Sequence, residues 1–307
     1  MYFSIHWQGN QTKGVKGSGG LAFKTDSSKG PFVTTLDGRI MEWISNNSSF
    51  VDFAYTSPNR TKEQCDGVEN PDMGSICGRP FALTFDSASG DFYIADAYHG
   101  VLATGPVGGD VIKLVGGFKF ANGVDNDMTG RRIYFSDASL TYDVKDAVQP
   151  GFIPDASGRL MRYDDTATEK VSTLLSGLRG GGGPAVSHDG TFVLISENRN
   201  DRITKYFPEG HYADRPGVLL QVNRNPDKIT RVEDREEFWV ATTRIGYVRP
   251  KAIIIPEGVR FDKNGKVLQT VQFGNEYPNL PINMVLEREG KLYVGSQFTD
   301  FIGVYSK

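Results

Sequence analysis

Apolar and polar residues alternate with a period of two in short runs along most of the chain, and turns separate the runs. The segment "GKLYVGS" (290–296) has the alternation of a β-strand with one buried face. Strands of similar length are predicted at "FYIAD" (92–96), "IYFSD" (133–137) and "FVLISE" (192–197). Sustained helical periodicity is almost absent, and the best helical candidate is a short stretch near 143–148. The pattern predicts an all-β protein.

One unit of strands recurs imperfectly along the chain. It consists of an apolar strand, a turn with Asp or Gly, a second apolar strand that ends in a small or acidic residue, and a third strand. A spacing of roughly 40–60 residues is typical of propeller blades with four strands each. The six copies cover 19–43, 79–104, 122–139 with 157–175, 183–207, 227–244 with 256–273, and 282–305.

These copies predict a six-bladed β-propeller that forms a single domain over residues 1–307. The last copy has about three strands. We therefore expect the opening "MYFSIHW" (1–7) to supply the missing outer strand and close the ring. Closure of this kind removes an exposed sheet edge. A sandwich of two domains is the alternative, but it explains the repeat less well.

Composition agrees with this fold and narrows the function classes. Frequent Gly (36) and Pro (15) suit a chain with many turns, and hydrophobic residues make up 38%. A net charge of −3 gives no reason to expect a nucleic-acid or anionic-membrane partner. No run of ~18 consecutive apolar residues predicts a membrane span.

Cysteines and glycosylation sequons favour an origin in the secretory pathway. Cys65 and Cys77 are the two cysteines, and a bridge between them would close a short loop, worth about 2–3 kcal/mol. No His or further Cys lies near them, so a zinc site is not expected. The start of the chain lacks the basic and long apolar parts of a signal peptide. Short sequons also arise by chance in a chain rich in Asn and Ser. The sequons begin at Asn10, Asn46, Asn47 and Asn59.

The first residues of each repeat are the candidate ligand-binding positions. In a propeller the innermost strands line a central channel, and their starts surround one mouth. A calcium-dependent hydrolase would need several hard oxygen ligands there, and only Asn122, Asp227 and Asn283 qualify. One carboxylate and two amides would make a weak site, so no metal or cofactor is predicted. Turn chemistry explains Asn122 and Asp227 about as well as ligand binding does.

Other groups give weaker signals. No Gly-x-Ser-x-Gly or His-Glu-x-x-His motif is present. The glycine run "GLRGGGGP" (177–184) lacks the Lys-Ser/Thr of a phosphate loop and suggests a close-packed channel entrance.

Tyr142 and Asp143 lie in a long insertion of the kind that forms lids over ligands. His99 follows a predicted inner strand and can edge into a pocket. Acidic residues end the second strand of several repeats and are interpreted as hydrogen-bonding elements; they are Asp96, Asp137 and Glu197.

A series of motifs runs through the chain in a fixed order. "DGRIMEWISNNSSFVDFAYTSPNRTKEQCDG" precedes the most specific segment, "CGRPFALTFDSASGDFYIADAYHG". "GRRIYFSDAS", "SGRLMRYD", "GTFVLISE", "RITKYFPEG", "EFWVA" and "GKLYVGS" follow. Over nearly its full length the chain resembles plant strictosidine synthases and strictosidine synthase-like proteins. The resemblance implies a six-bladed propeller, a Cys65–Cys77 disulfide and a vacuolar or secreted plant glycoprotein.

The resemblance also implies an activity and shows where this chain departs from it. Strictosidine synthases condense tryptamine with the aldehyde secologanin in a Pictet–Spengler reaction, and a carboxylate at the channel mouth moves the protons. In the family this glutamate lies ten residues before the tyrosine of the "LYxGS" strand. Counting back from Tyr293 reaches Asn283, and the family's nearby histidine falls on Pro281. Neither an amide nor a proline can accept a proton near pH 7.

Other positions relate the chain to branches of the family. Gly19 and Gly182 stand where many synthase-like proteins have a glutamate and an asparagine. The synthases proper also have Gly-Gly at the second place, and Tyr142-Asp143 resembles their Tyr-Asp over the pocket. The chain therefore leans toward the alkaloid-forming branch but lacks its base.

We predict a strictosidine synthase-like protein of alkaloid metabolism, an enzyme of the carbon–nitrogen lyase or cyclase type. It would bind an amine, an aldehyde or an iminium in the central channel. A preformed iminium would cyclise with a weaker demand for a base. The alternatives are a calcium-dependent ester or lactone hydrolase and a non-catalytic ligand-binding relative. The expected location is the secretory pathway, the vacuole or the extracellular space. Catalytic candidates are Asn283, Tyr142, Glu276 and His99, and predicted substrate contacts are Asn122, Asp227 and Phe298.

Overall fold

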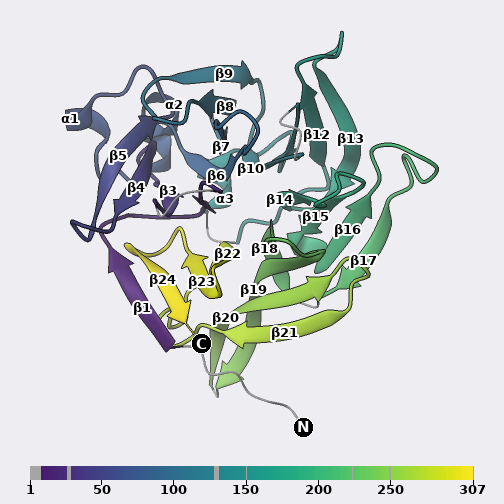
Figure 1. The fold of residues 1–307 in the computed structure, drawn as a ribbon. Helices are drawn as coiled ribbons and strands as arrows, with labels where there is room; N and C mark the ends of the chain where they lie inside the picture. The colour runs from purple at the N-terminus through teal and green to yellow at the C-terminus, as the bar shows by residue number, and fades with distance from the viewer. Residues whose placement is uncertain are drawn as a thin grey trace.

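The strands form six four-stranded antiparallel sheets that stand as blades around a central axis (Figure 1). The computed structural model describes residues 8–25, 29–127, 131–149, 151–222, 224–248 and 250–306. In blades 1 to 5 the chain runs from the innermost strand outward, so strand order in each sheet follows sequence order. The six-bladed β-propeller predicted from the repeats is confirmed.

The blades use the repeats found in the sequence. Blade 1 contains β2 (Leu21–Ala22), β3 (Phe32–Thr34), β4 (Arg39–Ile44) and β5 (Ser49–Tyr55). Blade 2 contains β6 (Pro80–Phe85), β7 (Phe92–Asp96), β8 (Gly100–Thr104) and β9 (Val111–Val115). Blade 3 contains β10 (Ala121–Asn126), β11 (Arg132–Asp137), β12 (Gly158–Asp164) and β13 (Val171–Leu178). Blade 4 contains β14 (Gly181–Val186), β15 (Val193–Glu197), β16 (Arg202–Tyr206) and β17 (Gly217–Gln221).

The last two blades and the short helices complete the fold. Blade 5 contains β18 (Asn225–Arg231), β19 (Glu237–Val248), β20 (Lys251–Asp262) and β21 (Val267–Gln272). Blade 6 contains β22 (Met284–Arg288), β23 (Lys291–Gly295), β24 (Phe301–Ser306) and β1 (Gln8–Lys13). The helices are α1 (Lys62–Cys65), η1 (Pro71–Met73), α2 (Gly74–Cys77), α3 (Val144–Ala147) and η2 (Asn198–Asn200). No helix in the described ranges is long and apolar enough to cross a membrane.

An N-terminal strand closes the last blade, as predicted, and its described part begins at Gln8. β1 pairs with β24 from Gln8↔Ser306 to Lys13↔Phe301 and forms the outer edge of blade 6. The predicted closing segment 1–7 lies outside the described residues. The closing strand reads "QGNQTK". An outermost strand needs no continuous apolar face, so hydrophobic alternation did not mark it.

The core lies between neighbouring blades. Phe32 of blade 1 meets Phe92 of blade 2 with ring centroids 4.6 Å apart, and Phe53 packs on both rings. Between blades 3 and 4, the fully buried Leu160 and Val193 belong to one apolar cluster. Burying such side chains contributes about 1.5–3 kcal/mol each. Packing between the second and outer strands of neighbouring blades therefore holds the blades together around the channel.

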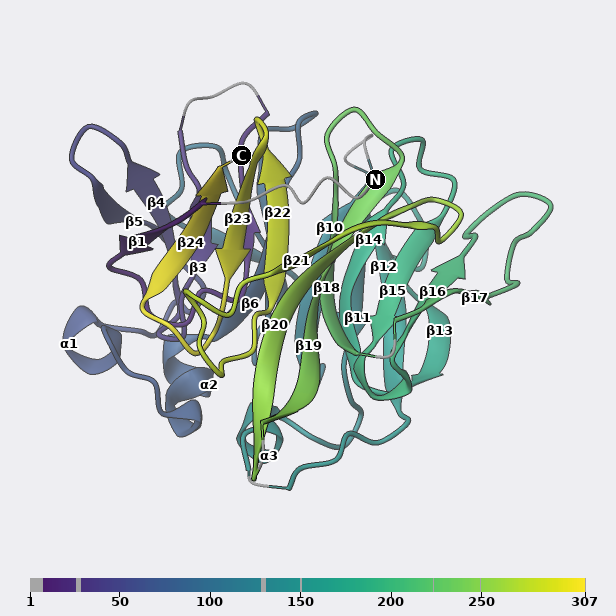
Figure 2. The ribbon, with the colours of Figure 1, turned by 90° about the horizontal axis from the view of Figure 1, so that it is seen from below.

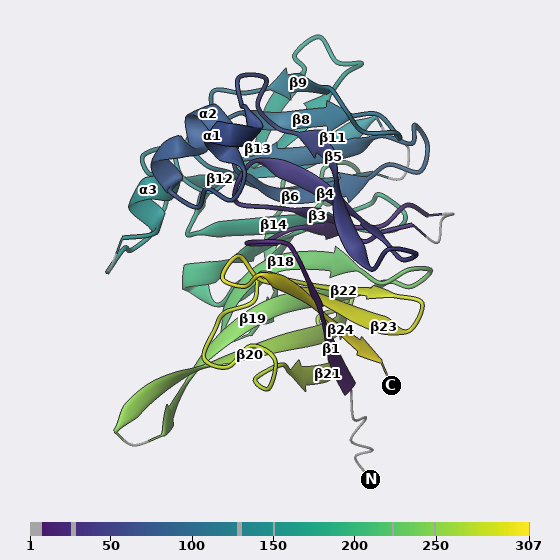
Figure 3. The same cartoon turned by 90° about the vertical axis from the view of Figure 1, so that its left-hand side faces the viewer.

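One side of the ring carries the helices and the longest hairpin. α1, α2 and α3 lie on this side, and the twelve-residue strands β19 and β20 extend past the rest of blade 5 in the same direction (Figures 2 and 3). The insertion between β11 and β12 that contains α3 also lies here. This side is the one at which the inner strands begin.

The acidic residues that end the second strands are hydrogen-bonding elements, as interpreted from the sequence. The Asp96 carboxylate accepts from the backbone N–H groups of Arg79 (2.7 Å) and Tyr98 (2.9 Å). Glu197, which is fully buried, accepts from Arg202 Nε and Thr204 Oγ1, each at 2.6 Å. These carboxylates fix the turn that leads from the second strand to the third.

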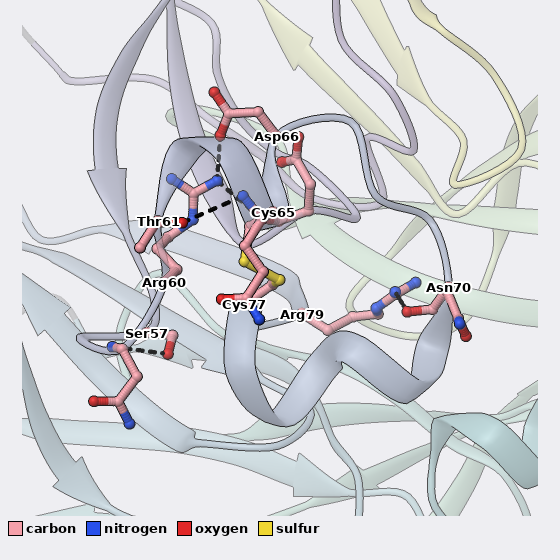
Figure 4. The surroundings of a disulfide bond; sticks show 12 residues. Ser57, Arg60, Thr61, Cys65, Asp66, Asn70, Cys77 and Arg79 are labelled. Carbon is pink, nitrogen blue, oxygen red and sulfur yellow. Dashed lines mark hydrogen bonds and ion pairs between the residues drawn. A yellow bond between two sulfur atoms is a disulfide. The ribbon is translucent and has the colours of Figure 1, made fainter.

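The predicted disulfide is confirmed. Cys65 ends α1, Cys77 ends α2, and their sulfur atoms are bonded (Figure 4). The Arg60 guanidinium pairs with Asp66 at 2.5 Å, and Arg79 donates to the Asn70 carbonyl at 2.9 Å. These contacts fasten the long connection between blades 1 and 2 to the start of β6.

The sequons lie in different settings. Asn46 and Asn47 are exposed in the turn between β4 and β5, and Asn59 is exposed just after β5. Asn10 belongs to β1, and its side chain is outside the described part of the structure. Three of the four sequons are therefore accessible for modification, and glycosylation stays a prediction.

Removing the disulfide by the double substitution Cys65→Ser, Cys77→Ser should lower the free energy of unfolding by about 3 kcal/mol. The bridge closes a loop with a sequence separation of 12, and an open loop gains conformational entropy in the unfolded chain. Urea denaturation of wild type and variant, each with and without reductant, measures the difference. Equal stabilities in all four samples would contradict this assignment.

The substitution Glu197→Gln should destabilise the protein by about 2 kcal/mol at neutral pH, because charged hydrogen bonds are replaced by weaker ones. Burial raises the pKa of Glu197, but hydrogen bonds from Arg202, Thr204 and Asn200 outweigh burial and hold that pKa below its ordinary value. This stabilisation is complete above the unfolded-state pKa and is lost as the pH falls through the folded-state pKa.

The measurement is the free energy of unfolding at neutral and acidic pH. The gap between Glu197→Gln and wild type should close in acid. The exposed Glu169→Gln variant is the matched control and should follow wild type throughout. A gap that stays constant with pH would show that the charge of Glu197 does not stabilise the fold.

Candidate functional site

A cavity of about 140 Å³ opens at the mouth where the inner strands begin. Its wall combines residues from blades 3, 4 and 5. The aromatic part of the wall contains Phe120, Tyr142 and Phe152, and the polar part contains Asn122, Asn198 and Asp227. The predicted site residues Tyr142, Asn122 and Asp227 are thus brought together.

Asp227 supplies the acidic side chain among the described residues of this wall. It lies in β18, the inner strand of blade 5, and its side chain is 22% exposed. Asn283 Nδ2 donates to Asp227 Oδ2 at 2.7 Å. Lys228 Nζ lies 3.6 Å from Asp227 Oδ1. The carboxylate is therefore held at one oxygen by an amide, and its other oxygen faces a cation.

Asn283 supports the site without lining the cavity. The residue is 7% exposed. Its Oδ1 accepts from the backbone N–H of Gln297 at 2.7 Å, while its Nδ2 donates to Asp227. Its carbonyl accepts from the Lys228 N–H at 3.1 Å. An amide used at both ends fixes its own orientation and joins blade 6 to blade 5. Position 283, where the resemblance predicts the family's base, thus holds an amide with a carboxylate beside it.

The insertion between β11 and β12 forms one side of the cavity. The Tyr142 ring stands edge-on to Phe152, with centroids 5.1 Å apart. Asp143 caps α3 through its side chain and accepts from the Lys145 N–H at 2.7 Å. Asp155 accepts from Thr141 Oγ1 at 2.5 Å and joins the two ends of the insertion. These bonds hold the aromatic pair over the mouth.

The charge of Asp155 is favoured by its surroundings. Burial raises the pKa of Asp155, but hydrogen bonds from Thr141 and Ser157 outweigh burial and hold the pKa below its ordinary value. The insertion therefore keeps this connection at neutral pH, where the carboxylate is ionised.

The glycine run is a close-packed channel entrance, as predicted. A Cβ on Gly182 would lie 2.2 Å from Ser196 Oγ and 2.8 Å from the Asp227 carbonyl oxygen. A Cβ on Gly123 would lie 2.3 Å from Gly183 Cα. Inner strands of neighbouring blades approach this closely only because side chains are absent.

Three predicted site residues lie elsewhere. His99 sits in the turn between β7 and β8, where its N–H donates to Asp96 Oδ1 at 3.0 Å. Glu276 accepts from Tyr305 Oη at 3.0 Å. It stands in the connection from outer strand β21 to inner strand β22, which starts at the outer edge of blade 5, away from the cavity. Phe298 is 53% exposed in the turn between β23 and β24. None of the three lines the cavity.

The donor set does not fit a divalent cation. The Asn283 oxygen already accepts from the Gln297 N–H at 2.7 Å, and Asn283 does not line the cavity. The Lys228 ammonium beside Asp227 would repel a second cation. Over the described ranges, no group of three or more His, Cys, Asp or Glu residues could hold a metal.

A larger cavity of about 260 Å³ lies at the opposite mouth, where the inner strands end. Its polar groups are largely bonded to one another. Arg231 pairs with Asp125 at 3.1 Å, Thr84 Oγ1 donates to the same carboxylate at 3.0 Å, and the Val186 N–H donates to its other oxygen. These contacts join four blades, 2 to 5. We therefore assign the candidate site to the smaller cavity, despite its size.

Some residues of the cavity carried no sequence signal. Phe120 and Phe152 stand in connections, where an aromatic residue follows no strand or helix pattern. Only the alignment of blades brings them next to Asp227. The sequence indicated the contact between Asp227 and Asn283 only weakly. Each residue stands at the start of the inner strand in one of two consecutive repeats, so the two lie at the same level of the channel.

Comparison with known structures finds the same fold. A gluconolactonase from Xanthomonas campestris has a TM-score of 0.67 at 13% identity and matches 98% of this chain and 89% of its own. The calcium-binding protein regucalcin from Agrobacterium tumefaciens has a TM-score of 0.64 at 13% identity, covering 95% and 90%. Similarity at this level of identity shows the propeller fold alone.

Sequence comparison gives a closer relationship. The family model for strictosidine synthase matches residues 120–211. Protein STRICTOSIDINE SYNTHASE-LIKE 12 of Arabidopsis thaliana is 33% identical over 293 residues, which cover 94% of this chain and 86% of that protein. Strictosidine synthase of Catharanthus roseus is 31% identical over 294 residues, covering 92% and 82%. The motifs, the propeller and these relatives agree, and the chain belongs to the strictosidine synthase family.

Proposed function

We propose that this protein binds an amine and an aldehyde, or the iminium formed from them, in the cavity at the starts of the inner strands. It would promote a Pictet–Spengler-type condensation or a related cyclisation in plant alkaloid metabolism. The observation that carries the proposal is the Asp227 carboxylate beside a wall of aromatic rings. Family membership supports the reaction class, because the Catharanthus relative is a strictosidine synthase.

Asp227 takes the part of the missing glutamate in this proposal. Cyclisation forms a bond between an aromatic carbon and the iminium carbon, and the ring carbon then loses a proton to restore aromaticity. A carboxylate within hydrogen-bond reach can accept that proton. Asn283 occupies Oδ2, so Oδ1 is the acceptor. The base thus comes from blade 5 and not from blade 6.

The aromatic wall suits the aromatic ring of the amine and the cationic iminium. A cavity of about 140 Å³ is close to the ~150 Å³ of cavities that hold one benzene ring. One aromatic ring of the amine would fit between Tyr142 and Phe120, with the rest of the substrate in the open mouth. Aromatic faces also stabilise a cationic iminium.

The disulfide and the exposed sequons support a location in the secretory pathway. A disulfide persists in oxidising compartments, and three sequons stand on exposed turns. We propose the vacuole or the extracellular space.

Ligand binding without turnover is the second candidate function. The observation that favours it is Asn283, an amide at the position of the family's base, with both its amide groups engaged in structural bonds. Calcium-dependent hydrolysis is not favoured by the donor set.

The substitution Asp227→Asn should lower the rate of condensation by about 10²-fold or more, because an amide cannot accept the ring proton. Amine binding should weaken less, since the aromatic wall is intact. A screen of tryptamine-like amines with aldehydes, read by mass spectrometry of the product, measures the rate, and calorimetry measures amine binding.

The exposed Asp165→Asn is the matched control and should behave as wild type. Full activity of Asp227→Asn would remove Asp227 from the mechanism. Amine binding by wild type with no product from any pair would favour the non-catalytic candidate.

The substitution Asn283→Asp should move the acid limb of the activity profile to higher pH by about one unit or more. Two carboxylates would then share the site, and like charges raise the pKa of one of them. Activity that needs an unprotonated Asp227 would then be lost earlier as the pH falls. An unchanged profile, with the fold verified by circular dichroism, would show that Asn283 and Asp227 are not coupled.

A further inference from the structure

Lys228 is a buried amine whose end has no hydrogen-bond partner. It follows Asp227 in β18, and its side chain is 3% exposed. Its Nζ has no hydrogen-bond partner within the described part of the chain. An ammonium group carries three donors, and leaving them unused inside a protein is unfavourable. Such a group is kept in a fold when something else requires it.

The amine lies directly behind the cavity wall. Nζ is 3.6 Å from Asp227 Oδ1 and 5.8 Å from the centroid of the Phe81 ring. Phe81 packs edge-on against Phe120, with centroids 5.2 Å apart. Both Asp227 and Phe120 line the cavity. Nζ is therefore one side chain away from a ligand in the cavity.

The surroundings fix the base of this side chain, and its end lies beside Asp227 without a hydrogen bond. The Lys228 N–H donates to the Asn283 carbonyl at 3.1 Å. A Cβ on Gly183 would lie 2.8 Å from Lys228 Cγ, so the glycine makes room for the stem. Beyond Cγ the chain is a flexible alkyl stem. Reaction with a ligand in the cavity would require rotation of these terminal bonds, past the partly exposed Asp227.

We infer that Lys228 captures the aldehyde substrate as an imine. This role rests on the proposed function, in which an aldehyde condenses with an amine in the cavity, and Lys228 would activate the aldehyde. The neutral amine attacks the carbonyl carbon, and a C–N bond forms. The resulting carbinolamine loses its hydroxyl group as water and becomes an imine. Asp227 accepts the ammonium proton before attack and returns a proton to the departing oxygen.

The substrate amine then displaces Lys228. It adds to the protonated imine carbon, the C–N bond to Lys228 breaks, and the lysine leaves as the free amine. The product of this exchange is the substrate iminium, placed beside Asp227 for cyclisation. No oxidant or reductant is consumed, and one water is released. A resident amine thus provides a route to the iminium in a chain without the family's glutamate.

Reductive trapping tests the inference directly. The full-length protein is incubated with phenylacetaldehyde and cyanoborohydride, which reduces imines to stable secondary amines. Peptide mass spectrometry then locates the added group. We expect Lys228 to be labelled about tenfold faster than the exposed Lys291, and added tryptamine to compete with the labelling.

The variant Lys228→Arg keeps the positive charge beside Asp227 but cannot form an imine. It should lose the internal label and slow condensation while the folded state, checked by circular dichroism, is retained. Labelling confined to exposed lysines, with condensation unchanged in Lys228→Arg, would overturn the inference and leave the proposed function intact. Rapid labelling of Lys228 in a protein that condenses no amine–aldehyde pair would support aldehyde capture and contradict the proposed function.

Discussion

The hydrogen bond from Asn283 Nδ2 to Asp227 Oδ2 is the contact on which the candidate site depends. It crosses from blade 6, whose outer edge is the N-terminal strand, to blade 5. The backbone carbonyl of the same asparagine accepts from the backbone N–H of Lys228, so one residue orients the Asp227 carboxylate and fixes the main chain beside it. Propeller closure through β1 and β24 holds blade 6 in place and thereby positions this asparagine. The chemistry of the mouth is thus tied to the way in which the ring closes.

In the proposed function, Asp227 does the work of the glutamate that the family resemblance predicts at position 283. An amide at the base position cannot take a proton, but it can hold the carboxylate of the next blade. Burial of Lys228 beside that carboxylate balances the charge, since an isolated buried ion would be strongly destabilising. The paired groups therefore stabilise each other, and Asp227 is the member of the pair that lines the cavity.

Much of the fold was predictable from the sequence, because every blade repeats the same alternation of apolar and polar residues. The closing strand "QGNQTK" was not, since an outer strand does not need that alternation. Asn122 and Asp227 were predictable as mouth residues from their places in the repeats, and Tyr142 from its place in a long insertion. Glu276 was proposed for its chemistry, and His99 because it follows a predicted inner strand. Their positions depend on the paths of connections around the blades, which periodicity does not encode.

A crystal structure with a tryptamine-like amine bound tests the central claim most directly. The account predicts the amine nitrogen within ~3 Å of the Asp227 carboxylate and the aromatic ring between Tyr142 and Phe120. Binding only in the opposite cavity, near Arg231 and Asp125, would contradict the assignment of the site to the mouth where the inner strands begin.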